Sequence, residues 1–511
     1  MISHPSSSPN QDWNLLVLSD LHLGEQRAGE DRTYVKERSD FLANHFSSFL
    51  KHYTSHREND LPWKLVIAGD MLDFMRVHVP NQPNVESEAS QDWEIPPHDL
   101  EGALQKLEQI FVLHHESFQA LVDFLLEDNQ VILITGNHDA ELDWPEVQVN
   151  LRIELFKLAQ AKQPDLCQER FDSLTTFQPW FYYEPNQLYI EHGHLHDRWC
   201  TIDQLFEPES EATSKQLRSP IHIASEHQNK VQEAMENFPM EEVDKLGPKV
   251  FYRWFADLPR SKKSQVLRQT FMVIYRLLGI AFKRSIVQAR NSSRSTFHQA
   301  HEKEHFPRLQ ETTVTPLYDS FFSMMQALYM DRLLLIIITS SLMTFFLVAP
   351  WSAQLRALCM TLTSIGAVAA FNFLTKTHPS SETAPAMFAA AMRVASRMNA
   401  PLIIFGHSHR FERRWLNDKQ LYINLGSWAA PLKEPETFIH STPMHPKDEE
   451  GLDFSQSYLV LKKDKKGYAL TVKLWDAHTG PHPYQEEASI PSACFDSSAS
   501  HAAMLNLNCL S

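Results

Sequence analysis

Five short apolar segments of the chain each end in a cluster of acidic, amide or histidine side chains, and this repeated pattern constrains the fold most. The clearest case is VILITGNHD, residues 131–139, in which a run too short for a helical period stops at a glycine. We interpret the run as a buried strand. Because open α/β sheets bind ligands just beyond the carboxyl ends of their strands, the polar tetrapeptide marks a candidate binding site.

The other four segments have the same arrangement. LLVLS is followed by DLHLG, KLVIA by GDMLDF, QLYIE by HGHLHD, and PLIIF by GHSHR. Alternate residues of a strand point to the same face, so Asp20 and His22 can converge on one ion. Single motifs this short arise by chance, whereas five in this order, each at a strand end, hardly ever do.

The pattern along the chain predicts a domain that is interrupted by an insertion. Residues 13–200 and 400–476 alternate strand-like and helix-like segments, whereas residues 201–399 are mostly helical and are interpreted as the insertion. We expect the Ser/Pro-rich residues 1–12 to be disordered and residues 477–511 to be a surface tail or disordered. Helices are predicted at residues 34–53 and 145–160, and one or two helices at residues 100–128. TFQPWFYYE with QLYIE predicts a hairpin.

Composition excludes two classes of protein. The net charge of −16 opposes non-specific approach to phosphate backbones, so we expect no nucleic-acid partner. The five cysteines are scattered, with no CxxC pair, which predicts neither a disulfide framework nor a zinc ribbon and is typical of a reducing compartment.

The order of the five motifs closely resembles the calcineurin-like metallophosphoesterase superfamily. The resemblance covers residues 14–198 and 401–475 but not the insertion. It implies an α/β fold of the superfamily type, a two-sheet metallophosphoesterase sandwich, here with a large, mostly helical insertion. It also implies two divalent metal ions as cofactors, and the ligand set would accept Mn, Fe or Zn.

The resemblance assigns a role to each site residue. Asp20, His22 and His409 would hold one ion, Asn137, His192 and His407 would hold the other, and Asp70 would bridge them. His138 resembles the family histidine that lies beside the phosphate, and Asp73 resembles the carboxylate that orients it.

Several neighbouring residues have alternative interpretations. Asp73 could instead cap the following segment, and Asp139 is expected to brace its loop rather than bind metal. His194 and His196 are expected to be solvated loop histidines. Arg198 and Arg410 could contact phosphate or form surface salt bridges.

A narrower resemblance suggests a lipid-linked substrate. GHSHRFERRW followed by LYINLGSW is similar to the branch of UDP-2,3-diacylglucosamine hydrolases, in which a helical insertion between the HG and GHxH motifs covers acyl chains. This chain departs from that branch in two ways. The branch carries arginine where His138 stands, and its insertion is far shorter.

The insertion contains a candidate membrane hairpin. Residues 333–375 include one charged residue, Arg356, and divide into two apolar halves, each close to the ~20 residues that span a ~30 Å hydrocarbon core. A hairpin would return the chain to its starting side, with Arg332 and Lys376 flanking it on a cytoplasmic face. The alternative is a soluble helical cap with this segment at its buried centre. Residues 268–294 predict a basic amphipathic helix on an anionic membrane surface.

Together these features predict a hydrolase with a binuclear metal site and a phosphorylated, lipid-linked substrate at the cytoplasmic face of the inner membrane. A soluble cytoplasmic phosphodiesterase or phosphoprotein phosphatase is the alternative, although Phe74 replaces the arginine that phosphoprotein phosphatases carry after the second aspartate. A non-catalytic, membrane-anchored scaffold is the third interpretation, and the complete ligand set argues against it.

Overall fold

The computed structural model describes ten segments of the 511-residue chain. They are residues 12–24, 32–77, 100–201, 219–223, 255–256, 258–288, 306–376, 383–429, 456–464 and 467–483. The predicted disorder of residues 1–12 and the end of the predicted tail therefore fall almost wholly outside the described residues.

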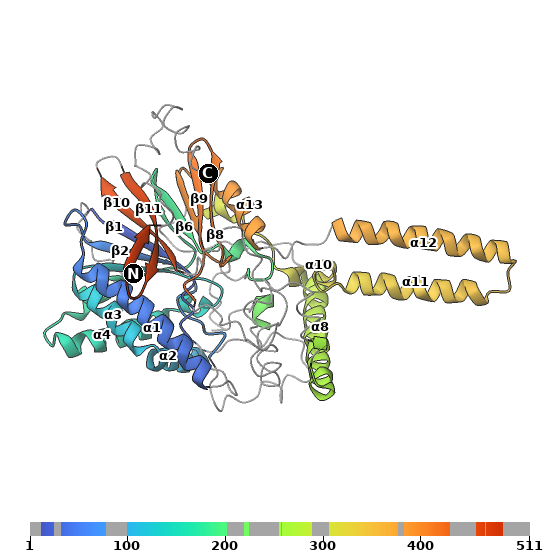
Figure 1. Ribbon diagram of the computed structural model, residues 1–511, viewed down its shortest axis with the longest axis horizontal. Helices are drawn as coiled ribbons and strands as arrows, with labels where there is room; N and C mark the ends of the chain where they lie inside the picture. Colours follow the sequence, from blue (N-terminus) through green and yellow to red (C-terminus); the bar gives the residue numbers. More distant parts are fainter. Residues whose placement is uncertain are drawn as a thin grey trace.

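One of the two sheets of the core has seven strands, which come from both parts of the predicted domain (Figure 1). Its order is β12 (Gly480–Pro483), β11 (Gly467–Asp476), β10 (Ser457–Asp464), β1 (Asn14–Leu18), β2 (Trp63–Ala68), β3 (Gln130–Ile134) and β4 (Thr175–Gln178). Strands β1 to β4 are parallel, so β1, β2 and β3 end at the same edge of the sheet.

The other sheet has five strands, which also come from both parts of the predicted domain. Its order is β5 (Phe181–Glu184), β6 (Leu188–Glu191), β7 (Leu402–Phe405), β9 (Gln420–Leu425) and β8 (Phe411–Asn417). Strands β6 and β7 are parallel neighbours, with Ile190 opposite Ile404, although the insertion separates them in the sequence. The pairing of β6 with β7 brings the HGHLHD and GHSHR motifs together.

Helices cover the outer faces of both sheets, which gives a layered α/β sandwich (Figure 1). The seven-stranded sheet packs against α1 (Arg32–Ser55), α2 (Leu100–Leu113), α3 (His115–Leu126), α4 (Pro145–Lys162) and α5 (Gln168–Asp172). The five-stranded sheet packs against α13 (Thr383–Ala395). Buried aliphatic side chains from both sheets, including Val66 and Ile404, fill the space between them. The predicted fold class is confirmed.

Two predicted elements differ from the structure. TFQPWFYYE was expected to be one strand of a hairpin, but β4 joins the seven-stranded sheet and only β5 pairs with β6. Pro179 lies between β4 and β5 and has no N–H for a sheet ladder, which explains the break. The predicted tail begins with β12. Of the one or two helices expected at residues 100–128, the structure has two, α2 and α3, which meet at His114.

The described part of the insertion is helical. It contains α8 (Arg260–Gln288), α9 (Phe306–Gln310), a 3₁₀ turn η5 (Leu317–Asp319), α10 (Phe321–Ala327), α11 (Met330–Val348) and α12 (Ala353–Lys376). Leu277 and Ile280 of α8 pack against Tyr318 and Met324 in a separate small core. This core forms the base from which α11 and α12 extend (Figure 1).

Helices α11 and α12 form a hairpin that projects away from the rest of the protein (Figure 1). The Arg332 guanidinium donates to Leu374 O at the base, 3.0 Å away, and the Arg356 guanidinium donates to Leu347 O at the tip, also 3.0 Å away. Both helices are long and apolar enough to cross a membrane, and 6% and 0% of their apolar windows are buried. They are therefore not the buried centre of a cap.

One buried asparagine joins the helical layer to the seven-stranded sheet, and we predict that it is needed for stability. Asn129 Oδ1 accepts from Trp63 N at 2.8 Å, and its Nδ2 donates to Phe124 O at 2.9 Å. Asn129→Ala leaves both groups unpaired in the core, so urea titration should show a loss of ~1–3 kcal/mol in unfolding free energy. Asn150→Ala, which removes a solvent-exposed bond to Glu146 O, is the control. Wild-type stability of Asn129→Ala would contradict this prediction.

Candidate metal centre

The carboxyl ends of β1, β2, β3, β6 and β7 meet at one place, and backbone hydrogen bonds join them. Asp20 N donates to Gly69 O at 3.1 Å, and His22 N donates to Asp70 O at 2.9 Å. Gly406 N donates to His192 O at 3.0 Å, which joins the ends of β7 and β6. The loops after β2 and β3 are joined by Phe74 N, which donates to His138 O at 3.1 Å. The predicted site residues lie together in a single cluster around these loops.

The first half of this cluster consists of Asp20, His22, Asp70 and His409. Their candidate ligand atoms all lie within 4.8 Å of one another. His409 Nε2 lies 3.1 Å from His22 Nε2 and 3.2 Å from Asp20 Oδ1. Two imidazole nitrogens and two carboxylates facing a common point form the mixed nitrogen and oxygen set that suits Mn, Fe or Zn.

The second half is centred on His192. Its Nε2 lies 3.2 Å from Asp70 Oδ2 and 3.1 Å from Asn137 Oδ1, while its Nδ1 lies 2.9 Å from Ala68 O. The carbonyl of Ala68 accepts the Nδ1 proton, so Nε2 is the nitrogen that faces Asp70. The His407 ring lies beside His192, with 5.1 Å between ring centroids. Asp70 contacts both halves, and its position fits a carboxylate shared by two ions.

The backbone of the site is strained. Five of the ten described non-glycine residues with positive φ are predicted metal ligands: Asp20, His22, Asp70, His407 and His409, with φ between 51° and 68°. This conformation is uncommon for residues with a Cβ and costs on the order of 1–3 kcal/mol each. Concentration of such strain at one place is typical of a functional site.

Gly136 provides the space that Asp70 needs. A Cβ at Gly136 would lie 2.1 Å from Asp70 Oδ1 and 2.6 Å from Asp70 N. Both distances are far below van der Waals contact, and Asp70 is itself buried, so it has no room to move. The glycine of the GNHD motif therefore allows the loop after β3 to lie against the loop after β2.

His138 and Asp73 lie together at the edge of the cluster. His138 Nδ1 is 3.0 Å from Asp73 Oδ2, and Arg76 Nε is 3.0 Å from the same oxygen. The other oxygen of Asp73 accepts from Arg76 N at 3.2 Å, so Asp73 caps a turn as well as contacting His138. The sequence reasoning missed Arg76, because only the turn brings its guanidinium back onto Asp73.

Buried charges determine the electrostatics of the site. Burial alone would lower the pKa of His138, but the carboxylates of Asp73 and Asp70 outweigh it and raise that pKa above its ordinary value. For Asp70, burial would raise the pKa, but the nearby His192 and His138 hold it well below its usual range. The buried carboxylates and the imidazoles of His138 and His192 therefore favour each other's charged forms.

Asp139 braces the loops, as expected. Its carboxylate accepts from Gly136 N at 2.6 Å and from Met71 N at 2.8 Å. Burial and the charge of Asp70 raise the pKa of Asp139 to about 8. Asp139 thus ties the loop after β3 to the loop after β2.

The prediction for His194 and His196 was wrong, because both side chains are buried rather than solvated. His196 Nε2 lies 2.7 Å from Glu191 Oε1, and its Nδ1 lies 3.1 Å from Thr312 O. Thr312 belongs to the insertion and lies 116 positions further along the chain. The local sequence pattern therefore could not indicate that the insertion buries His196. The insertion also binds Arg198, whose Nε donates to Thr315 O at 3.3 Å.

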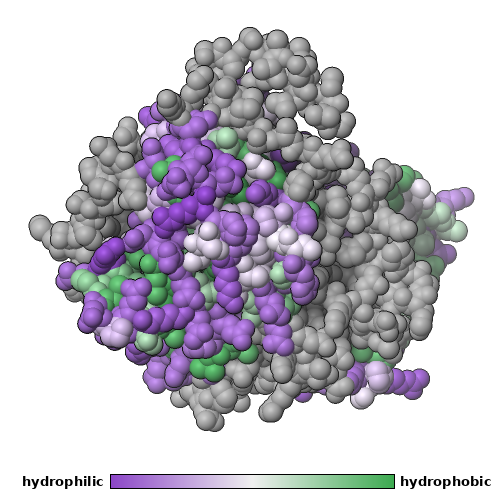
Figure 2. All heavy atoms as spheres, turned by 60° about the vertical axis from the view of Figure 1, so that its left-hand side comes forward, coloured by the Kyte–Doolittle hydropathy of each residue, from purple (hydrophilic) through white to green (hydrophobic). Residues whose placement is uncertain are grey.

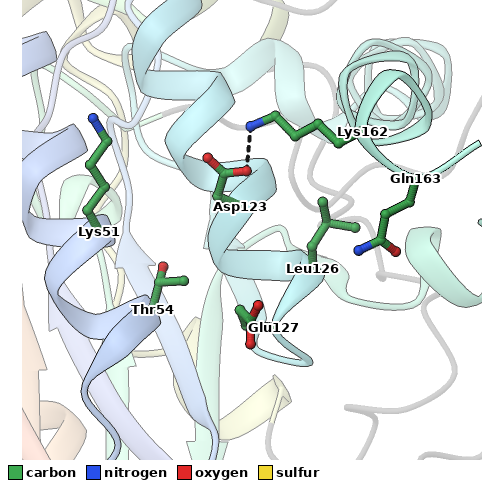
Figure 3. Close-up of a pocket in the computed structure, with 7 residues that line it drawn as sticks. All are labelled: Lys51, Thr54, Asp123, Leu126, Glu127, Lys162 and Gln163. Atoms are coloured by element: carbon green, nitrogen blue, oxygen red, sulfur yellow. Dashed lines mark hydrogen bonds and ion pairs between the residues drawn. The ribbon is translucent and has the colours of Figure 1, made fainter.

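A surface hollow elsewhere on the protein is not the site (Figure 3). It lies between the ends of α1, α3 and α4, and the Lys162–Asp123 ion pair crosses it. Helix α3 ends just before β3 begins, so this hollow is near the amino ends of the strands. The metal cluster lies at their carboxyl ends.

Comparison with known proteins agrees with this geometry. Residues 14–260 match the family model of calcineurin-like phosphoesterases. No curated protein and no solved structure matched the chain. The match supports the metallophosphoesterase superfamily, and with the ligand cluster it supports a metal-dependent phosphoester hydrolase. His407 and His409 lie beyond the matched residues, but they follow β7, and the structure places His409 beside Asp20 and His22 and His407 beside His192.

We predict that Gly136→Ala weakens metal binding. The added Cβ overlaps Asp70, so the shared carboxylate must move away from both halves of the cluster. Calorimetric titration with Mn²⁺ should show an at least tenfold loss of affinity, together with a lower unfolding temperature. Gly366→Ala in α12, where no atom lies within 4 Å of the new Cβ, is the matched control. Wild-type Mn²⁺ affinity in Gly136→Ala would disprove the steric role of Gly136.

Proposed function

We propose that the chain is a binuclear-metal hydrolase that cleaves a lipid-linked phosphoester or pyrophosphate at the cytoplasmic face of the inner membrane. The convergence of the predicted ligands around Asp70 carries the proposal. We assign Asp20, His22, Asp70 and His409 to one ion and Asp70, Asn137, His192 and His407 to the other. Such a pair of ions, when bound, polarises phosphoryl oxygens and provides hydroxide near neutral pH.

In this proposal His138 is the proton donor to the leaving oxygen. Its Nδ1 faces Asp73, so Nε2 is the nitrogen that can reach a phosphate. Asp73 and Asp70 favour the protonated imidazole through their charge, and Arg76 keeps Asp73 in its orientation. An imidazolium at this place can donate its Nε2 proton as the bond to the leaving group breaks.

The hairpin of α11 and α12 supports a membrane location. The two helices have 19 and 24 residues, close to the ~20 needed to span a ~30 Å hydrocarbon core. Large apolar side chains are exposed along both helices, among them Ile337 at 53% and Ile365 at 61%. The face of the body turned forward in Figure 2, by contrast, is largely hydrophilic where it is coloured. Arg332 and Lys376 at the base of the hairpin favour a cytoplasmic orientation.

Helix α8 supports the same location. It runs across the base of the hairpin (Figure 1), as expected for a helix that lies along the surface that the hairpin enters. Five large apolar side chains are exposed on it at roughly helical spacing: Leu267, Phe271, Tyr275, Phe282 and Ile286. The helix carries seven basic residues and no acidic one. Apolar and basic side chains together suit the headgroup layer of an anionic membrane.

The catalytic assignment predicts two inactive variants. Purified protein with Mn²⁺ should hydrolyse a chromogenic phosphodiester or phosphomonoester. Asp70→Ala removes the shared ligand and His138→Ala the proton donor, so kcat should fall by about 10²–10⁴-fold in each. Asp128→Ala and His115→Ala change exposed residues of the same types and are the controls. Activity that survives in both site variants would refute these roles.

The membrane assignment predicts that the full chain sediments with membranes and needs detergent for extraction. Ile337→Lys combined with Ile365→Lys should release it, since a lysine at mid-span costs about 2.5–3.5 kcal/mol. Val112→Lys combined with Val149→Lys makes the same change at exposed apolar positions of α2 and α4, and should leave the chain in the membrane fraction. Recovery of the wild-type chain in the soluble fraction without detergent would rule out the hairpin as an anchor.

A further inference from the structure

We infer that Asp197 is a positioning residue that holds the His407 ring so that Nδ1, not Nε2, meets the second metal ion. The inference rests on the proposed two-metal function. Asp197 Oδ2 lies 3.1 Å from His407 Nε2, and the two side chains are 17% and 7% exposed. Asp197 ends the HGHLHD motif, but the sequence does not indicate its contact with His407, because that contact joins residues 210 positions apart.

The contact determines the tautomer of His407. A carboxylate only accepts hydrogen bonds, so Nε2 must carry the proton that Asp197 binds. In a neutral imidazole the other nitrogen, Nδ1, then carries the free lone pair. Metal-binding histidines usually donate their second N–H to a carboxylate or carbonyl in this way, which fixes the ring and raises its basicity.

The His407 ring packs beside His192, but it has few other contacts that could set its rotation. Its backbone is fixed by a φ of 68° and by donation from His407 N to Asp20 Oδ2 at 3.2 Å. These contacts determine where the Cα lies but leave the side-chain rotation open. Within the described part of the chain, the polar contact of the His407 ring is the one with Asp197.

Asp197 is itself held in one orientation. Its Oδ1 accepts from Trp199 N at 2.8 Å, which leaves Oδ2 for His407. The carbonyls on either side of it accept from the insertion: Leu195 O from Val314 N at 3.1 Å, and Arg198 O from Leu317 N at 3.0 Å. The insertion therefore braces the loop that carries Asp197, and through Asp197 it reaches the metal site.

A separate metal ion is the competing explanation. Ligand atoms of Asp197, Cys200 and His407 lie within 4.8 Å of one another, as a cation site requires. An ion at Nε2 together with another at Nδ1 would need an imidazole that has lost both N–H protons. A hydrogen bond to Asp197 makes no such demand, so we assign positioning rather than a third ion.

The test is Asp197→Asn. Trp199 N keeps the amide oxygen on its own side, so the amide NH₂ faces His407 Nε2 and donates to it. His407 then carries its proton on Nδ1, where the ion should bind. In a Mn²⁺ titration, calorimetry measures the affinity of each ion, and the Mn–Mn coupling in electron paramagnetic resonance reports when both sites are filled. One ion should bind about 10–100-fold more weakly than in the wild type. The other ion should bind as in the wild type, which also shows that the variant is folded.

Two further variants and one spectrum complete the design. Cys200→Ser and the exposed control Asp128→Asn should bind both ions as the wild type does. In ¹⁵N-histidine-labelled wild-type protein, with His407→Gln for assignment, His407 should carry its proton on Nε2. This spectrum tests the inference even where Asp197→Asn does not fold.

The outcomes separate the inference from the function on which it rests. Two ions bound at wild-type affinity by Asp197→Asn would overturn the inference and leave the two-metal site standing. Loss of one ion in Cys200→Ser would overturn it in favour of a third ion. A wild-type chain that binds no Mn²⁺ at all would refute the proposed function, and the inference with it.

Discussion

The position of Asp70 is the constraint on which the rest of the site depends. Its buried carboxylate lies 3.8 Å from His22 Nε2 in one half of the cluster and 3.2 Å from His192 Nε2 in the other. A buried carboxylate is stable only when cations or hydrogen-bond donors surround it, so both halves must close on it. Little space is left around Asp70. Five of the predicted ligands have a left-handed backbone, and position 136 has room only for a residue without a Cβ.

The two sheets are both needed to surround Asp70. The seven-stranded sheet supplies the aspartates and Asn137, and the five-stranded sheet supplies His192, His407 and His409. Strand β7 lies beside β6 and runs parallel to it, so the crossover leaves the sheet at the HGHLHD motif and re-enters it at the amino end of β7, before the GHSHR motif. An insertion at this crossover therefore starts at the metal site, whatever its length. The topology therefore explains why the helical insertion touches the site.

Strand ends could be predicted from the sequence because each one combines a short apolar run with polar ligands in adjacent positions. Asp20, His22 and Asp70 are of this kind, and the structure brings them together. Residues whose partners come from distant segments could not be predicted. His196 is buried by Thr312, and Asp197 meets His407 only because β6 and β7 are neighbours. Local patterns encode strands and their ends, whereas these contacts depend on tertiary packing.

The loop of residues 193–198 has two structural roles at once, and this limits how the insertion and the metal site can move. One side of the loop meets His407 through Asp197, and the other side accepts backbone hydrogen bonds from Val314 and Leu317 of the insertion. Leu317 packs in the same small core as α8, from which the hairpin of α11 and α12 extends. A displacement of this core relative to the sheets would pull directly on Leu195 O and Arg198 O. In the proposed membrane-bound state, the surface that holds α8 would thus also help to fix the loop beside the second metal ion.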